Sequence, residues 1–213
     1  MKRPVPHKFL LERFLEPFEL FGIVHFGLNT YTDREWGYGD EAPALLDPKG
    51  FDPDQIVKAC KDGGLQGLVI VCKHHDGFCL WPTKTTTHNI TQAPFSKYCP
   101  DYVKAMSDAC KRHGLKCGFY VSPWDRNAPD YATESYREKY WAQVLEIFGG
   151  YYGPAFEMWF DGANGGDGYY GGARETRKIP FNYYRFDELI AEVRKIQPQV
   201  CVMTDECYGD FNW

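Results

Sequence analysis

Asp161 is the residue of this chain best placed to do chemistry. It closes the run FEMWFD at 156–161, after which the chain breaks off into a glycine-rich stretch at 162–166. A carboxylate directly after a strand is where barrel enzymes carry catalytic groups. The same position also suits an aspartate that caps a loop through its own backbone, so Asp161 alone leaves both interpretations open.

Polar and aromatic residues follow four other apolar runs of the sequence. His25 lies near the end of the first run, the pair at 74–75 follows the second, and Glu206 follows the fifth. Tyr120 and Trp124 lie at the end of the third run. If these runs are parallel strands, all their carboxyl ends lie at one edge of the sheet. The sequence therefore predicts a single site around Asp161.

The histidines of this set allow two kinds of site. His25, His74, His75 and Asp161 are chemically reasonable metal ligands, but the ligand spacing of a known zinc motif is absent. A neutral imidazole offers one hydrogen-bond donor and one acceptor, which suits the hydroxyls of a polyol. We expect polyol contacts, with no metal and no cofactor. A core histidine bonded to the backbone stays an alternative, above all for His25.

The elements that must position these residues alternate along the chain. Apolar runs predict five strands, at Phe21 to Phe26, Gly67 to Cys72, Lys116 to Ser122, Phe156 to Phe160 and Val200 to Thr204. Amphipathic segments predict helices between them, at Pro53 to Gly63, Tyr102 to His113, Tyr136 to Phe148 and Phe186 to Ile196. Such alternation is typical of an α/β fold with a parallel sheet.

The fold class predicted from this order is a (β/α)8 TIM-like barrel. No G-x-G-x-x-G or P-loop motif follows the first strand, which argues against a nucleotide-binding sheet. A complete barrel takes ~250 residues, so only about five units fit into this chain. We expect residues 1–213 to form the N-terminal part of a catalytic barrel that continues beyond residue 213. The alternative is an open sheet with an unpaired edge, which proteins normally avoid.

Composition narrows the class of ligand. The formal charge is −5 without any basic block, so neither nucleic acid nor an anionic membrane surface is an expected partner. Aromatic residues make up 17% of the chain, and many lie beside polar residues in glycine-rich loops. Flat rings with polar tips suit the faces of a carbohydrate, although most of the phenylalanines are expected in the core. A small neutral sugar is the expected partner.

The cysteines and the N-terminal residues carry less information about function. The eight cysteines include no C-x-x-C spacing, and several lie in apolar runs, which predicts buried free thiols. No apolar run approaches the ~18 residues of a membrane span. The start lacks the apolar segment of a signal peptide, so this chain carries no predicted export signal. A periplasmic or secreted full-length form stays compatible with that, and the oligomeric state is unspecified.

Several motifs, in order, give the chain a family resemblance. FGIVHFG at 21–27 with TDREW at 32–36, KHHDGF at 73–78 with LW at 80–81, YVSPWD at 120–125 and WFDGA at 159–163 are similar to the successive motifs of the α-L-fucosidases of glycoside hydrolase family 29. The likeness covers nearly the whole chain. It is closer to the branch that prefers α-1,3/4-linked fucose on branched glycans than to the branch active on simple aryl fucosides.

This resemblance implies a retaining exo-glycosidase with a fucose pocket at the carboxyl ends of the barrel strands. Asp161 matches the nucleophile, which forms a covalent glycosyl-enzyme intermediate. By the same matching, fucose hydroxyls are held by His25, His74 and His75. Trp36 and Tyr120 line the pocket, with Trp36 close to the apolar edge at the C5 methyl group. Glu35 and Trp124 are assigned to the same pocket, where Glu35 and Asp125 orient other residues.

The second carboxyl of such a mechanism is not evident in the chain. A retaining glycosidase needs one about 5 to 5.5 Å from the nucleophile as acid and base. In the family this glutamate follows shortly after a motif like DFNW at 210–213, which places it beyond the last residue here. Glu206 is the in-chain substitute. Two rival functions follow: a fucose-binding, lectin-like module without turnover, and a metal-dependent hydrolase on the same barrel.

Overall fold

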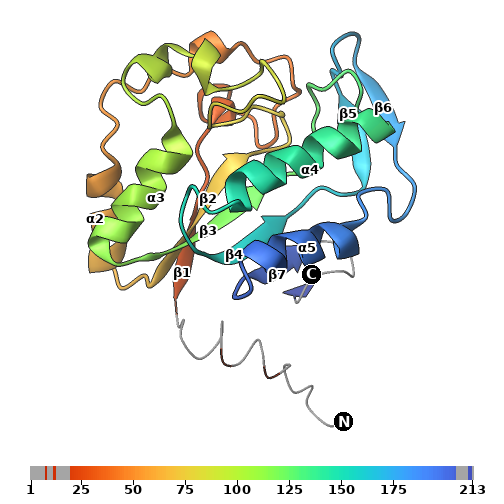
Figure 1. Cartoon of the computed structure of the whole chain (residues 1–213). Coiled ribbons are helices and arrows are strands. Elements are labelled where there is room, and N and C mark those ends of the chain that lie inside the picture. The colour runs from red at the N-terminus through yellow and green to blue at the C-terminus, as the bar shows by residue number, and fades with distance from the viewer. Residues whose placement is uncertain (1–7, 9–11, 13–19, 205–210, 213) are drawn as a thin grey trace, which may run out of the picture.

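A parallel sheet organises the part of the chain that the computed structural model describes, which is residues 8, 12, 20–204 and 211–212 (Figure 1). Its strand order is β1-β2-β3-β4-β7-β8, and every neighbouring pair is parallel. The strands are β1 (Phe21–Val24), β2 (Gly67–Lys73), β3 (Lys116–Val121), β4 (Ala155–Phe160), β7 (Cys201–Thr204) and β8 (Phe211–Asn212). The carboxyl ends of these strands therefore lie at one edge, as predicted.

The strands form where the sequence is continuously apolar. All seven residues of β2 are buried, because a parallel strand with both faces covered needs apolar side chains in both directions. The five predicted strands are confirmed, with ends that differ by one or two residues. The first strand ends at Val24 rather than Phe26, so His25 lies beyond the strand and not within it.

The four predicted helices are also confirmed. They are α2 (Pro53–Asp62), α3 (Tyr102–His113), α4 (Glu134–Phe148) and α5 (Phe186–Ile196). Asp52 caps the start of α2, since its side chain accepts from the backbone N–H groups of Asp54 and Gln55. Short 3-10 helices occur at η2 (Leu28–Tyr31), η3 (Pro43–Leu45), η4 (Ile90–Gln92) and η5 (Pro94–Lys97).

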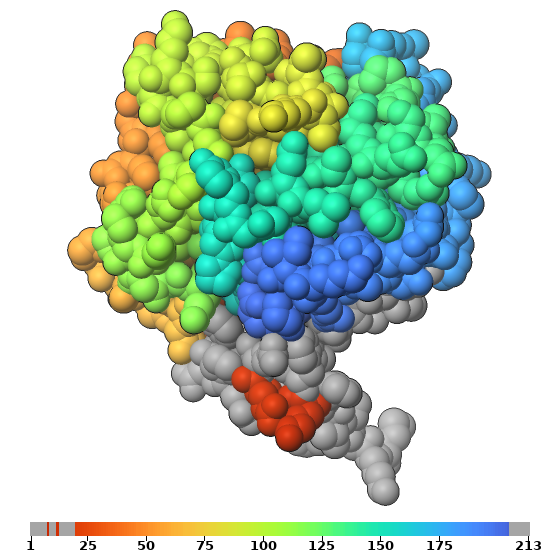
Figure 2. All heavy atoms as spheres, viewed as in Figure 1, coloured from red at the N-terminus to blue at the C-terminus, as the bar shows by residue number. Residues whose placement is uncertain are grey.

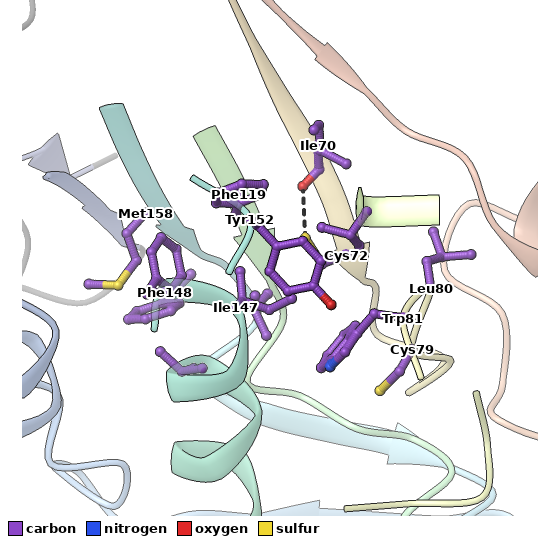
Figure 3. Close-up of a cluster of buried hydrophobic side chains, with 14 of the residues drawn as sticks. Ile70, Cys72, Cys79, Leu80, Trp81, Phe119, Ile147, Phe148, Tyr152 and Met158 are labelled. Atoms are coloured by element: carbon purple, nitrogen blue, oxygen red, sulfur yellow. Dashed lines mark hydrogen bonds between the residues drawn. The ribbon is translucent and has the colours of Figure 1, made fainter. Parts of the chain in front are cut away.

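The two faces of the sheet are covered differently. Leu68, Ile70 and Cys72 of β2 point into the large core beneath the helices, where they meet rings such as Trp81 and Phe119 (Figure 3). Helices α3, α4 and α5 lie side by side on this face and form its outer surface (Figure 2). The alternate residues of β2 belong to a smaller cluster on the other face, formed by Val69, Val71, Tyr120, Phe156 and Cys201.

One feature differs from the prediction. The glycine-rich stretch after Asp161 is not all loop, because β5 (Gly165–Gly168) pairs antiparallel with β6 (Glu175–Lys178). Side-chain patterns do not predict this hairpin, because it contains glycines at positive φ such as Gly165 and Gly166. The described strands form an open sheet with edges at β1 and β8. They confirm the predicted α/β class with a parallel sheet, as expected of about five β/α units, and closure into a (β/α)8 barrel stays a prediction.

The remaining sequence expectations concern thiols and membranes. The seven cysteines in the described part of the chain are free, six of them buried, which confirms the predicted thiols. Among the described residues, no helix is both long and apolar enough to cross a membrane.

Glu157 is an unusual residue of the sheet, since it is fully buried and its two carboxyl oxygens have no hydrogen-bond partner among the described residues. Burial raises the pKa of Glu157 to about 8. The folded state therefore keeps a proton that the unfolded chain releases near its ordinary pKa of about 4.3. The carboxyl therefore makes its full contribution to the free energy of unfolding at pH values below that pKa. This contribution is lost as the pH rises towards 8.

We expect Glu157→Gln to remove this part of the pH dependence. In the wild type the group lowers the free energy of unfolding by up to ~1.4 kcal/mol per pH unit between about pH 5 and 8. A glutamine of nearly the same shape cannot ionise, so the variant should lose less stability over that interval. Urea unfolding of both proteins at pH 5, 6.5 and 8 measures the difference. Identical pH profiles would contradict the buried, protonated carboxyl.

Candidate active site

A cavity of about 930 Å³ opens at the carboxyl ends of the parallel strands. Five of the residues predicted from the sequence line it: Glu35, Trp36, His75, Trp124 and Asp161. The backbone after β4 closes one side, through Gly162 and residues 164–167. The carboxylate, an imidazole and two indoles are thus brought into one concave site, as expected for a ligand pocket.

The carboxylate of Asp161 is hydrogen-bonded to a neighbouring side chain and is also accessible from the cavity. It is the first residue after β4, and the hydroxyl of Tyr120 donates to its Oδ2 atom at 3.0 Å. Nε2 of His75 lies 3.9 Å from the same oxygen. The side chain keeps 34% of its surface exposed, so the carboxylate is oriented and yet accessible from the cavity.

The histidines and Tyr120 form a row of rings beside Asp161. The ring centroids of His25 and His74 are 4.3 Å apart, and those of His74 and His75 are 4.2 Å apart. His74 also stacks on Tyr120, with 13° between the planes. Because β2 ends at Lys73, the two adjacent histidines lie beyond the strand and need not point to opposite faces of the sheet. Of this row, His75 lines the cavity and the other three lie next to it.

The histidine rings are neutral. Burial lowers the pKa of His74 to about 2, assisted by the repulsion that a protonated His74 ring would meet from the protonated forms of His75 and His25. Burial likewise lowers the pKa of His75 to about 3, assisted by the guanidinium of Arg126. The pKa of His25 is also lowered by burial, against the opposing effect of Glu35. At neutral pH the row therefore offers uncharged donors and acceptors and does not neutralise Asp161.

Two indole rings form an aromatic wall that continues from His75 of this row. Trp36 is 47% exposed at the rim, and its ring lies 5.8 Å from that of Trp124 and 5.7 Å from that of His75. Trp124 is buried, its indole N–H donates to the hydroxyl of Tyr170 at 2.9 Å, and the guanidinium of Arg126 lies 4.9 Å from its ring. The wall thus has one fixed ring inside and one accessible ring outside.

A buried ion pair supports the loop that carries Trp124. Lys73 is fully buried, with its Nζ atom 2.7 Å from Oε1 of Gln143 and 3.6 Å from Oδ2 of Asp125. The other oxygen of Asp125 accepts from the backbone N–H groups of Asn127 and Ala128. Asp125 therefore fixes the turn after Trp124, consistent with its predicted orienting role.

Several residues of the site did not stand out in the sequence. Arg34 and Arg126 line the cavity, Asn29 donates to His74, and Ser122 contacts His75. Ser122 had a visible signal, since it lies inside the YVSPWD motif at a strand end. Arg34 had one too, since it lies inside the TDREW motif. Asn29 and Arg126 had none, because their roles depend on loops whose course the sequence pattern does not specify.

Two hypotheses from the sequence involve none of the contacts described above: Glu206 as the second carboxyl, and a metal site. Glu206, the in-chain candidate for the second carboxyl, lies outside the described residues. For the metal hypothesis, no group of three or more His, Cys, Asp or Glu side chains in the described part of the chain is arranged to hold a metal ion.

Comparison with known proteins identifies the family of this chain. The model of the family described as alpha-L-fucosidase matches residues 18–212. Alpha-L-fucosidase 1 of Arabidopsis thaliana is 34% identical over 203 residues, which cover 95% of this chain and 37% of that protein. The crystal structure of a glycoside hydrolase 29 family member from an unknown rumen bacterium superposes with a TM-score of 0.90 at 42% identity, covering 99% of this chain and 38% of the other. The chain thus spans less than two fifths of the length of these relatives.

Proposed function

The chain belongs to the α-L-fucosidase family of glycoside hydrolases, and from that premise we propose that its site hydrolyses terminal α-L-fucose on glycans. We further propose that the reaction retains the anomeric configuration and that the natural linkage is α-1,3/4. The observation that carries the proposal is the oriented and accessible carboxylate of Asp161 in the cavity.

Asp161 is the nucleophile of this proposal. Its Oδ2 atom is held by Tyr120, so the carboxylate keeps a fixed direction while it attacks the anomeric carbon. Attack forms a bond from a carboxylate oxygen to that carbon and breaks the glycosidic bond, and water later releases the sugar from the enzyme. The neighbouring histidines are neutral, so they bring no positive charge to the carboxylate that would attack.

The other predicted residues bind the sugar. His25, His74 and His75 offer neutral hydrogen-bonding groups for fucose hydroxyls. Trp36 and Trp124 supply an apolar wall, with Trp36 nearest the C5 methyl group. Glu35 is exposed at the rim, and its backbone carbonyl accepts from Asn29 at 3.0 Å, which fixes the start of the loop that carries Trp36.

Residues 1–213 are proposed to be the N-terminal part of a catalytic barrel. The acid and base is then either Glu206 or a glutamate supplied by further sequence, and we favour the second. Without that group, attack by Asp161 still proceeds on substrates whose leaving group needs no proton. An aryl fucoside with an activated leaving group is therefore the substrate for a first test.

Proton NMR during hydrolysis of such a fucoside tests the stereochemistry. Two displacements at the anomeric carbon return the configuration of the substrate, so α-L-fucose should appear first and then equilibrate with the β anomer. Direct release of β-L-fucose would indicate a single displacement and contradict the role given to Asp161.

A fucose-binding module without turnover is the second candidate. It is favoured by the row of neutral rings and the aromatic wall, which can hold a sugar without an acid and base. Calorimetric binding of L-fucose with no hydrolysis of any fucoside, and no covalent product, would support this candidate. Hydrolysis that depends on Asp161 would eliminate it.

A further inference from the structure

Ser122 has more hydrogen-bond acceptors around it than protons to donate. It is fully buried, and its Oγ atom lies 2.9 Å from the carbonyl oxygen of Trp124, 3.2 Å from that of Asp161 and 2.7 Å from Nδ1 of His75. A serine hydroxyl has one proton, and carbonyl oxygens only accept. If the proton goes to a carbonyl, Oγ is free to accept from His75, and two hydrogen bonds form. If it goes to His75, only one forms.

The arrangement with two hydrogen bonds places a proton on Nδ1 of His75. In a buried site an unpaired polar group is costly, so this arrangement is the stable one. The other ring nitrogen, Nε2, then carries a lone pair, and this atom lies 3.9 Å from Oδ2 of Asp161. The two facing atoms are both acceptors and cannot bond to each other.

Asn29 has the opposite effect on His74. Its Nδ2 atom lies 3.0 Å from the carbonyl oxygen of Glu35, which must face an amide N–H and thereby fixes the orientation of the amide. The same nitrogen lies 3.3 Å from Nδ1 of His74. An amide nitrogen donates and does not accept, so Nδ1 of His74 accepts and the ring proton lies on Nε2.

We propose that Asn29 and Ser122 are positioning residues that fix the adjacent histidines in opposite tautomers, His74 with its proton on Nε2 and His75 with its proton on Nδ1. The pair then presents one donor and one acceptor rather than two equivalent groups. This arrangement matches a ligand hydroxyl that donates into the space between His75 and Asp161, with a second oxygen that accepts from His74. The role of this pair in sugar binding rests on the proposed function, whereas the assignment of the two tautomers does not.

Gly162 allows this geometry, because its backbone packs against the His75 ring. It has a φ of +86°, and a Cβ atom there would lie 2.6 Å from Cε1 and 2.8 Å from Nδ1 of His75. The ring is thus confined between Gly162 and Ser122, and it keeps Nδ1 towards the hydroxyl.

NMR of protein labelled with ¹⁵N-histidine tests the proposal, since long-range ¹H–¹⁵N correlations show which nitrogen of each ring carries the proton. The chain has six histidines, and His74→Gln and His75→Gln assign the two signals. We expect opposite tautomers in the wild type. Ser122→Ala should move the His75 proton to Nε2, where Asp161 is the available acceptor, whereas Ser122→Thr keeps the hydroxyl and the wild-type tautomer. Asn29→Asp should move the His74 proton to Nδ1.

The same tautomer in both wild-type rings would overturn the proposal, as would unchanged tautomers in Ser122→Ala and Asn29→Asp. The wild-type spectrum decides the matter even if one variant fails to fold. For fucoside hydrolysis we expect kcat/KM to fall ~10-fold in Ser122→Ala, as for the loss of one hydrogen bond, and to recover in Ser122→Thr. Opposite tautomers without any hydrolysis by the wild type would refute the proposed function and leave the tautomer assignment intact.

Discussion

Asp161→Asn is expected to lower kcat/KM for an activated aryl fucoside by roughly 10⁴-fold or more, the scale seen when a covalent nucleophile is removed. Asparagine has nearly the same shape and can still accept from Tyr120, so the fold and the pocket should persist. Its amide cannot form the glycosyl ester. Steady-state hydrolysis, with urea unfolding as a check on stability, measures the effect.

The matched control is Asp62→Asn, which removes a carboxylate from the exposed end of α2. It should leave hydrolysis unchanged. Tyr120→Phe removes one hydrogen bond to Asp161 and should cost only ~10-fold, because the carboxylate itself remains. If Asp161→Asn keeps more than a tenth of the wild-type rate, another residue is the nucleophile.

Lys73→Met is expected to destabilise the protein by about 3–5 kcal/mol, the range for breaking a buried ion pair from one side. Lys73 is fully buried, and its removal leaves the carboxylate of Asp125 buried without its cation. Chemical denaturation at pH 7 measures the change. The exposed Lys116→Met, at the start of β3, is the control and should stay within about 0.5 kcal/mol of the wild type.

A double variant separates charge from packing. Asp125→Asn keeps an oxygen that can accept from the backbone at 127–128, and it removes the negative charge. Lys73→Met with Asp125→Asn should therefore be more stable than Lys73→Met alone. Equal stability of the single and double variants would show that the cost arises from packing around the methionine and not from the unpaired charge.

The parallel strands and their helices could be predicted because each has a local signal. Apolar runs mark β2 and β4, the latter interrupted only by Glu157, and the capping residue Asp52 marks the start of α2. The site residues that directly follow strands were accessible for the same reason. The ends of β4 and β2 determine the positions of Asp161 and His75. Because both strands pair in parallel with β3, this pairing brings the two residues together.

The loops could not be predicted in this way. The hairpin β5–β6 begins at glycines with positive φ, which carry no side-chain pattern. Asn29 lies 45 residues from His74 in sequence, and their contact depends on the course of the segment after β1. The parallel order of the strands follows from the alternation of strands and helices, whereas closure into an eight-stranded barrel depends on units beyond the described strands and stays a prediction.

Covalent labelling tests the central role of Asp161 most directly. A fluorinated fucoside with an activated leaving group should form a glycosyl-enzyme whose hydrolysis is slow, because the fluorine destabilises the positively charged transition state. Mass spectrometry should show one added fluorofucosyl group per chain, and peptide mapping should place it on Asp161, with no label in Asp161→Asn. A label on another residue, or binding of the sugar with no label at all, would contradict the account.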